Sequence, residues 1–148
     1  MHKSLVKLTA SEVVEGLKKG EISPLELITA AETRILETEP AINALPTLCF
    51  ERARACARSL MKKLKDGSEN NRGWLAGLPV AIKDLTDVAG VRTTYGSTIF
   101  KDHVPKASHP LVKRIEKMGG IIIAKSNTPE FGAGGSTFND VFGKTCNP

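Results

Sequence analysis

The sequence predicts an α/β protein whose helices come first. Two capping boxes near the start of the chain are each followed by apolar residues at helical spacing. Further along, an apolar run at residues 80–82, a helical stretch from near Ser108 and a second apolar run at residues 121–124 follow one another. Strand, crossover helix and strand in this order are typical of a βαβ unit with two parallel strands. We therefore expect a helical lead over residues 1–73, then strand, helix, strand and a glycine-rich loop over residues 74–148.

The first two helices are predicted by their capping boxes. Thr9 and Ser23 each stand three residues before a glutamate, and Pro24 occupies a first helical position, where proline is well accepted. Apolar residues at helical spacing are expected to face the interior until Gly20 ends the first helix and Pro40 ends the second.

A third helix is predicted over about residues 50–65, after an extended piece around Pro46. Cys49 and Cys56 lie two helical turns apart, so both are expected to be small core residues on one helix face. The polar, turn-rich residues 66–73 predict a surface loop. The apolar stripe expected on this helix consists of Phe50, Ala53, Ala57, Leu60, Met61 and Leu64.

The second half of the chain contains the two predicted strands. Pro79 fixes the entry into residues 80–82, which predict a buried strand. Residues 121–124 are continuously apolar, a pattern typical of a strand covered on both faces. From residue 131 onward no periodicity remains, and so long a stretch without secondary structure is either functional or unfinished. The helix between the strands has Pro110 in its first turn and an expected apolar face of Leu111, Val112, Ile115 and Met118.

Composition and charge exclude several classes of protein. With 148 residues, 41% of them hydrophobic and 25% charged, the chain fits one globular domain. No stretch is apolar enough to span a membrane and the start is too polar for a secretory signal, so we expect no membrane contact and a cytoplasmic location. The net charge of +5 suits nucleic acid, but the basic residues are scattered, and one Trp and one Tyr are too few for a base-stacking surface.

No metal or cofactor is expected. The three cysteines and three histidines lack the short spacing of a metal site, and an odd number of cysteines argues against a disulfide framework. The string GKT at residues 143–145 is part of a phosphate-binding motif, but Phe138 stands where that motif needs a glycine. Nucleotide binding through this string is therefore not expected.

Lys83 is the candidate catalytic residue. It directly follows the predicted strand at residues 80–82. A lysine at the inner end of a buried strand must either extend its ammonium group to water or give up some of its charge, because burial disfavours the charged form. A neutral lysine is a base. The alternative is a surface lysine on an edge strand.

The motifs around Lys83 and toward the end of the chain resemble a known family. The strings GLPVAIKD from Gly77, KSNTPEF from Lys125 and FGKTCNP from Phe142 occur in the order and spacing of the N-terminal part of the amidase signature family. That family includes bacterial amidases and the A subunit of glutamyl-tRNA(Gln) amidotransferase. SPLEL and INA in the helical lead are similar to the family's entry region, so the resemblance covers nearly the whole chain. Two strings differ from the family pattern. AKSN stands where the family usually has GKTN, and Ser108 to Pro110 stand where an acidic residue and a small residue are more common.

The resemblance implies a serine hydrolase with a triad of serine, a second serine in a cis peptide, and lysine. Lys83 matches the catalytic lysine, which acts unprotonated and draws a proton from the nucleophilic serine through the bridging serine. Its pKa would have to fall from about 10.4 to near neutrality, which corresponds to about 4 kcal/mol and is within the reach of burial. Asp84 and Ser97 are expected to have structural roles near Lys83.

The resemblance also implies a place for the substrate, a small-molecule amide. Ser136, with the glycines before it, matches the family loop beside the substrate channel, and a plain turn is the alternative. The candidate substrate-binding residues are Gly132, Ala133, Gly134, Gly135 and Ser136.

Both family serines lie in a glycine- and serine-rich stretch after the NP at which this sequence stops, at Pro148. Residues 1–148 are therefore expected to be the N-terminal part of a single amidase-signature domain, an incomplete piece of a larger mixed sheet flanked by helices. The remainder of that domain is the expected partner, and the piece alone is expected to be inactive. A homo-oligomer is compatible with this assignment.

Three alternatives remain open. The chain could be a basic RNA-contacting module, which the absence of salt-dependent RNA binding would exclude. It could belong to the A subunit of a tRNA-dependent amidotransferase, in which case nucleic acid would also be a partner. It could also be a noncatalytic interaction module that uses the same fold.

Overall fold

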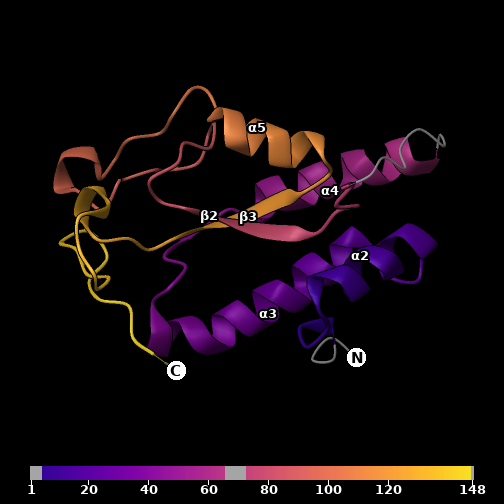
Figure 1. Ribbon diagram of the computed structural model, residues 1–148, viewed down its shortest axis with the longest axis horizontal. Coiled ribbons are helices and arrows are strands. Elements are labelled where there is room, and N and C mark those ends of the chain that lie inside the picture. Colours follow the sequence, from indigo (N-terminus) through magenta and orange to yellow (C-terminus); the bar gives the residue numbers. More distant parts are fainter. Residues whose placement is uncertain (1–4, 66–72, 148) are drawn as a thin grey trace.

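A three-stranded mixed sheet with helices on both faces forms the centre of the computed structural model, which describes residues 5–65 and 73–147 (Figure 1). The elements in chain order are α2 (Ala10–Lys19), α3 (Pro24–Ile42), β1 (Thr47–Leu48), α4 (Phe50–Lys65), β2 (Pro79–Lys83), the 3-10 turn η1 (Thr98–Phe100), α5 (Pro110–Lys117), β3 (Ile121–Ser126) and the 3-10 turn η2 (Glu130–Gly132).

Both predicted capping boxes are confirmed. The Thr9 hydroxyl accepts a hydrogen bond from the backbone N–H of Glu12, and the Glu12 carboxylate accepts one from the backbone N–H of Thr9. Ser23 and Glu26 repeat this arrangement at the start of α3. Each box satisfies backbone donors that the first turn of a helix leaves without partners.

One predicted helix end is confirmed and one is wrong. Gly20 caps α2 in the left-handed conformation. The expectation that Pro40 ends α3 is wrong, because the helix continues to Ile42. Pro40 removes one backbone donor, yet Asn43 adopts a left-handed conformation and its N–H donates to the carbonyl of Glu39 at 2.8 Å. The cap therefore falls three residues beyond the proline.

The third predicted helix is confirmed as α4, with Phe50, Ala53 and Ala57 buried. The expectation for the two cysteines is wrong. Cys49 immediately precedes α4, so it does not share a helix face with Cys56, and both side chains are half-buried. The predicted surface loop falls almost entirely outside the described residues, as does the side chain of Leu64.

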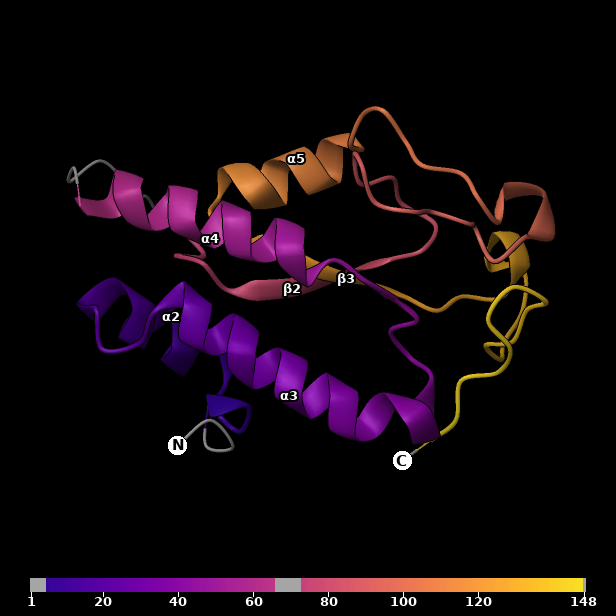
Figure 2. The same ribbon diagram turned by 180° about the vertical axis from the view of Figure 1, so that it is seen from behind.

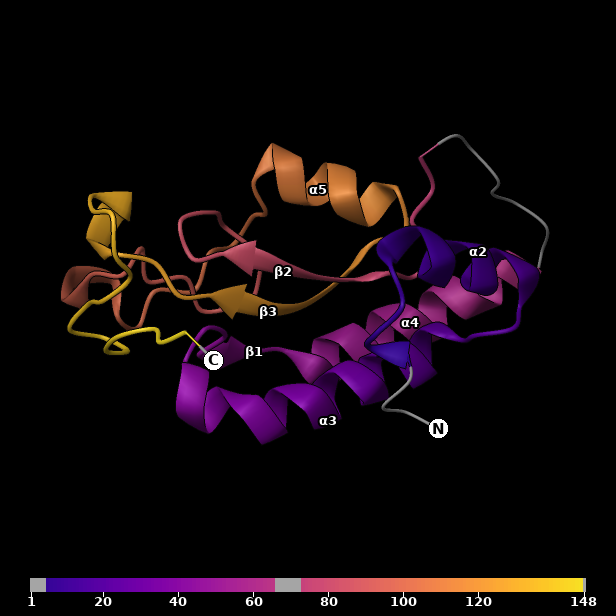
Figure 3. The ribbon, with the colours of Figure 1, turned by 60° about the horizontal axis from the view of Figure 1, so that its bottom comes forward.

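The sheet has the order β1-β3-β2. β2 and β3 are parallel, with Lys83 beside Ser126 and a register shift after Val80, and α5 connects them. This confirms the predicted βαβ unit. The extended piece around Pro46 becomes β1, which pairs antiparallel with β3 and makes the sheet mixed. Figure 3 shows α5 on one face of the sheet and α3 and α4 on the other, and Figure 2, the view from behind, shows α4 in front of the strands.

β3 is covered on both faces, as predicted. Ile121 and Ile123 pack with α3 and α4, whereas Ile122 packs in a second cluster with Val112 of α5 and Ile82 of β2. The expectation that β2 is a buried strand is wrong, because Ile82 is its one buried residue. β2 lies at an edge of the sheet among the described residues, so its other side chains have fewer neighbours.

The predicted apolar face of α5 is only partly correct. Val112 is fully buried and Ile115 packs against the same cluster, but Leu111 is 55% exposed. Adjacent residues in a helix point about 100° apart, so Leu111 and Val112 cannot both face the sheet. Among the helices of residues 5–65 and 73–147, none combines the length and the apolar character that crossing a membrane requires.

Candidate functional site

The candidate site lies at the carboxyl ends of β2 and β3. In a parallel pair these ends meet at one edge of the sheet, and ligands of open α/β sheets bind there. Lys83 ends β2, and Ser126 stands beside it at the end of β3. The segments that follow, including η1 and η2, gather at this end of the molecule, away from α2 (Figure 1).

Lys83 is exposed, as is Ala81, whereas Ile82 between them is buried. The expectation that its amine lies in an apolar interior is therefore wrong for the described part of the chain. Side chains alternate between the two faces of a strand. Ile82 faces the cluster under α5, which places Ala81 and Lys83 on the opposite face at the sheet edge. The backbone carbonyl of Lys83 accepts a hydrogen bond from Thr86 at 3.0 Å.

Asp84 holds three segments together. Its backbone N–H donates to the carbonyl of Ser126 at 3.1 Å, and its carbonyl accepts from the N–H of Tyr95 at 3.0 Å. Its carboxylate accepts from the backbone N–H and the hydroxyl of Thr94, at 2.9 and 2.6 Å. Asp84 is 1% exposed. These contacts give it the structural role expected from the sequence.

Lys125 is the buried lysine of this site, and the sequence interpretation missed it. It is fully buried, and its Nζ donates to Asp84 Oδ1 at 2.9 Å and to Thr93 Oγ1 at 2.7 Å. Burial lowers the pKa of Lys125, while the hydrogen bond to Asp84 and the charge of that carboxylate oppose the change. A signal was present, because IIIAK ends an apolar run with lysine just as VAIK does.

Two residues with left-handed backbone meet beside Asp84. Tyr95 has φ 53° and Phe131 has φ 47°, and the N–H of Phe131 donates to the carbonyl of Tyr95 at 2.7 Å. Such conformations are unfavourable for residues with side chains and concentrate near functional sites. Ser97, in the same turn, is fully buried, and its hydroxyl accepts from the N–H of Ile99 at 3.4 Å.

Burial raises the pKa of Tyr95 to about 12, assisted by its hydrogen bond to Asp87. The phenol therefore stays protonated at neutral pH. It serves here as a hydrogen-bond donor to the Asp87 carboxylate, at 2.5 Å.

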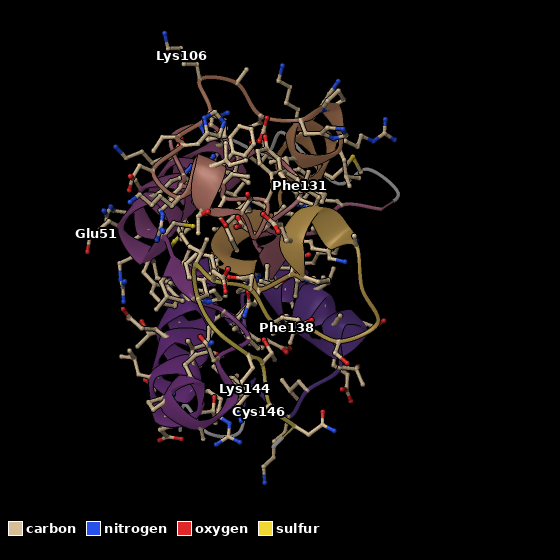
Figure 4. All side chains as sticks on the ribbon, turned by 90° about the vertical axis from the view of Figure 1, so that its left-hand side faces the viewer. Glu51, Lys106, Phe131, Phe138, Lys144 and Cys146 are labelled. Atoms are coloured by element: carbon tan, nitrogen blue, oxygen red, sulfur yellow. The ribbon has the colours of Figure 1, made fainter. Side chains whose placement is uncertain are left out.

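The glycine-rich loop borders an open cavity of about 420 Å³. Four of the five predicted substrate-binding residues line it, namely Ala133, Gly134, Gly135 and Ser136. Gly132 and Lys83 are not among its lining residues, so the structure does not bring the lysine into this cavity. Figure 4 looks onto this end of the molecule and labels Phe131 and Phe138, which stand at the two ends of the loop.

An amide network holds the end of this loop against β3. Asn139 is buried, and its Nδ2 donates to Asn127 Oδ1 at 2.7 Å and to the carbonyl of Thr128 at 2.8 Å. Asn127 in turn donates to Thr145 Oγ1 at 3.1 Å. Asn43, the cap of α3, donates to the carbonyl of Phe142 at 2.7 Å. The loop therefore has a defined path although it lacks regular structure.

Within residues 5–65 and 73–147, no group of three or more His, Cys, Asp or Glu side chains is placed to hold a metal ion. The chemistry that these residues offer is that of two lysines, one exposed and one paired, beside a loop with accessible backbone groups.

Comparisons with known proteins agree on one family. The chain matches the Amidase family model over residues 26–148. It is 40% identical over 144 residues to the A subunit of glutamyl-tRNA(Gln) amidotransferase from Natranaerobius thermophilus, and the match covers 97% of this chain and 29% of the relative. A relative of the same name from Geotalea daltonii is 37% identical with the same coverage. The chain thus spans less than a third of the length of these relatives.

Solved structures show the same relationship. A bacterial aryl acylamidase of the amidase signature enzyme family superposes with a TM-score of 0.86 at 29% sequence identity, over 95% of this chain and 29% of that one.

Proposed function

Because the chain belongs to the amidase family, we propose that it is the N-terminal part of an amide hydrolase and supplies the catalytic lysine, Lys83. The observation that carries this proposal is the family match over residues 26–148, which includes both Lys83 and the glycine-rich loop. A mixed sheet with helices on both faces and the similarity to amidase structures support it.

In the proposed mechanism Lys83 is the base. Its neutral amine takes a proton from a bridging serine, which takes one from the nucleophilic serine as that oxygen attacks the amide carbonyl. The carbon–nitrogen bond breaks, the leaving amine receives the proton, and the acyl group stays on the nucleophile as an ester. Water then hydrolyses the ester and releases the acid. Both serines come from sequence outside these 148 residues.

The exposure of Lys83 places a condition on this proposal. A lysine that acts as a neutral base must lose contact with bulk water, since hydration favours the charged form. Lys83 and Ala81 lie together on an exposed face of β2, and β2 is an edge strand among the described residues. We propose that the remainder of the domain pairs with this edge and covers this face, because an unpaired strand edge is a template for a further strand.

The glycine-rich loop is the proposed substrate contact. Glycines allow close approach of a ligand to the backbone, and their amide groups can point toward a polar atom of the ligand. Ala133 to Ser136 line the cavity, and Ser136 is exposed, so its hydroxyl is accessible to a small-molecule amide.

The tRNA-dependent amidotransferase is the second candidate, favoured by the name of the relatives at 37 and 40% identity. In that case the same lysine would serve an amide hydrolysis whose ammonia is passed on, and other subunits and tRNA would be partners. Glutamine hydrolysis that depends on added Glu-tRNA(Gln) and partner subunits would identify this function. Turnover of simple amides by the protein alone would identify the free amidase.

The test of the proposed role is Lys83→Ala in the complete polypeptide that contains this chain. We expect amide hydrolysis to fall by a factor on the order of 10³, as for the loss of a general base. Lys113→Ala is the matched control, because Lys113 is an exposed lysine of α5 outside the site. The activity of this variant should stay within about twofold of that of the parent.

The 148-residue chain alone should show no turnover. Retention of a tenth or more of the activity by Lys83→Ala would refute the catalytic assignment. Loss of activity with intact binding of the remaining domain would exclude the noncatalytic interaction module.

A further inference from the structure

We propose that Lys125 is a positioning residue for Lys83, because its pairing with Asp84 both fixes the end of β2 and neutralises the carboxylate of the residue that follows the proposed base. This inference rests on the proposed function, since it concerns the setting of the proposed base. Lys125 itself is enclosed and does not line the cavity beside the glycine-rich loop. It can therefore act on the reaction only through its neighbours.

The geometric part follows from the contacts of Asp84. Lys83 is the register partner of Ser126 and directly precedes Asp84, the residue that binds Lys125. The two carboxylate oxygens of Asp84 accept hydrogen bonds from different segments: Oδ1 accepts from Lys125 of β3, and Oδ2 accepts from Thr94. Together with the backbone bonds of Asp84, these contacts fix the direction in which β2 ends. The Cα atoms of Lys83 and Asp84 are about 3.8 Å apart, so the contacts of Asp84 also restrict the backbone position of Lys83.

The electrostatic part follows from the faces of the sheet. Lys125 is the register partner of Ile82, and both lie on the face under α5. Lys83 is on the opposite face, so Lys125 and Lys83 do not compete for the same carboxylate. An unpaired Asp84 carboxylate would favour the protonated form of an amine one residue away. Paired with the Lys125 ammonium, it presents a nearly neutral group.

The remaining charges around Lys125 do not change this account. Asp84 is its one ion-pair partner within the described residues. The other titratable groups close enough to influence it are the Asp87 carboxylate and the Cys49 thiol. The Asp87 carboxylate accepts a hydrogen bond from the Tyr95 hydroxyl, and burial raises the pKa of Cys49 to about 11, so that the thiol is neutral at working pH.

A purely stabilising role is a weaker explanation. Removing two charges from water costs several kcal/mol, and apolar side chains of similar volume often stabilise a fold as well as a buried ion pair does. The position of this pair, directly beside Lys83 and Ser126, points to a local function at the strand ends.

The test compares three forms of the complete polypeptide: the parent, Lys125→Met, and the double variant Asp84→Asn with Lys125→Met. The measurement is kcat/KM for amide hydrolysis against pH, with thermal unfolding in parallel. Lys125→Met leaves the carboxylate without its counter-charge, so we expect the acidic limb of the profile to move about one unit to higher pH, which is about a tenfold loss of rate on that limb. The double variant removes both charges, and its limb should return to within about 0.3 units of the parent.

If the acidic limb of the pH profile of Lys125→Met coincides with that of the parent and only the melting temperature is lower, the proposal is overturned in favour of a structural role. If Lys125→Met does not fold, Lys125→Gln keeps the donors but not the charge and gives the same comparison. The double variant is an independent test, because an acidic limb displaced from that of the parent would contradict the claim that Asp84 and Lys125 together act as a neutral pair. Full activity in Lys83→Ala would refute the proposed function, whereas inactive Lys83→Ala with an unmoved limb in Lys125→Met refutes this inference alone.

Discussion

Gly96→Ala should destabilise the protein at the point where two segments of the candidate site touch. Gly96 has φ +68°, and a Cβ placed on it would lie 2.9 Å from the carbonyl oxygen of Thr128 and 3.1 Å from the N and Cα of Glu130. All three atoms belong to the backbone, so no side-chain rotation can relieve the contact. Gly90 offers a matched control, since it has φ +73° and nothing within 4 Å of such a Cβ.

The difference between the two variants isolates the steric contact. Both place alanine in the left-handed region, at a cost of about 1–2 kcal/mol. Gly96→Ala must also move the Thr128 to Glu130 segment by a few tenths of an ångström, and overpacking of this kind costs about 1–3 kcal/mol more. We therefore expect a free energy of unfolding lower by about 1–2 kcal/mol for Gly90→Ala and by about 2–5 kcal/mol for Gly96→Ala.

Urea unfolding of the complete polypeptide measures these values. Because Glu130 begins the turn η2 that leads into the glycine-rich loop, Gly96→Ala should also raise KM for an amide substrate, whereas Gly90→Ala should leave KM unchanged. Equal destabilisation by the two variants would show that the close approach of these segments is not present in solution.

Two further predictions concern the surroundings of the site. Burial raises the pKa of the Cys49 thiol to about 11, so at pH 9 about 1% of it is thiolate, and iodoacetamide should label it at least about tenfold more slowly than in urea. Because the pKa of Cys49 is higher in the folded than in the unfolded protein, the stability that its neutral thiol contributes is fully present below about pH 8.5 and is lost as pH rises toward 11. Mass spectrometry measures the labelling, and a native protein labelled as fast as the unfolded one would contradict the burial of Cys49. Asn127→Ala leaves the buried Nδ2 of Asn139 with one acceptor fewer and should lower the free energy of unfolding by about 1–3 kcal/mol. The substitution should also speed proteolytic cleavage of the segment that follows Asn139. A variant that is as stable as the parent and as resistant to proteolysis would exclude the amide network as the contact that holds the loop.

Local signals predicted the framework of the fold. The capping boxes at Thr9 and Ser23 fixed two helix starts, since a capping box is a contact between residues three apart and is complete in the sequence. The parallel βαβ unit followed from the order of its elements. The end of α3 did not follow, because the cap depends on Asn43 adopting a left-handed conformation and on contacts that residues far along the chain make with it.

The site itself depends on which strand lies in the centre of the sheet, and local pattern cannot determine this. VAIK and IIIAK both end an apolar run with lysine. β3 lies between two strands and under helices on both faces, so Lys125 is buried and needs Asp84, whereas β2 lies at an edge and Lys83 is exposed. The length of the apolar run carried the one available hint, since the longer run belongs to the central strand.

The exposure of Lys83 and the burial of Lys125 are therefore two results of one arrangement. A lysine that is to be a base must be able to lose its proton, and a carboxylate at the next residue would hold that proton in place. The parallel register puts Lys125 beside Ile82, on the face where Asp84 points, and leaves Lys83 on the other face beside Ser126. Lys125 of the central strand thus pairs with the acid that follows the edge-strand lysine. If Lys83 is the base that we propose, the remaining requirement for a neutral amine is a cover over the face that Lys83 shares with Ala81.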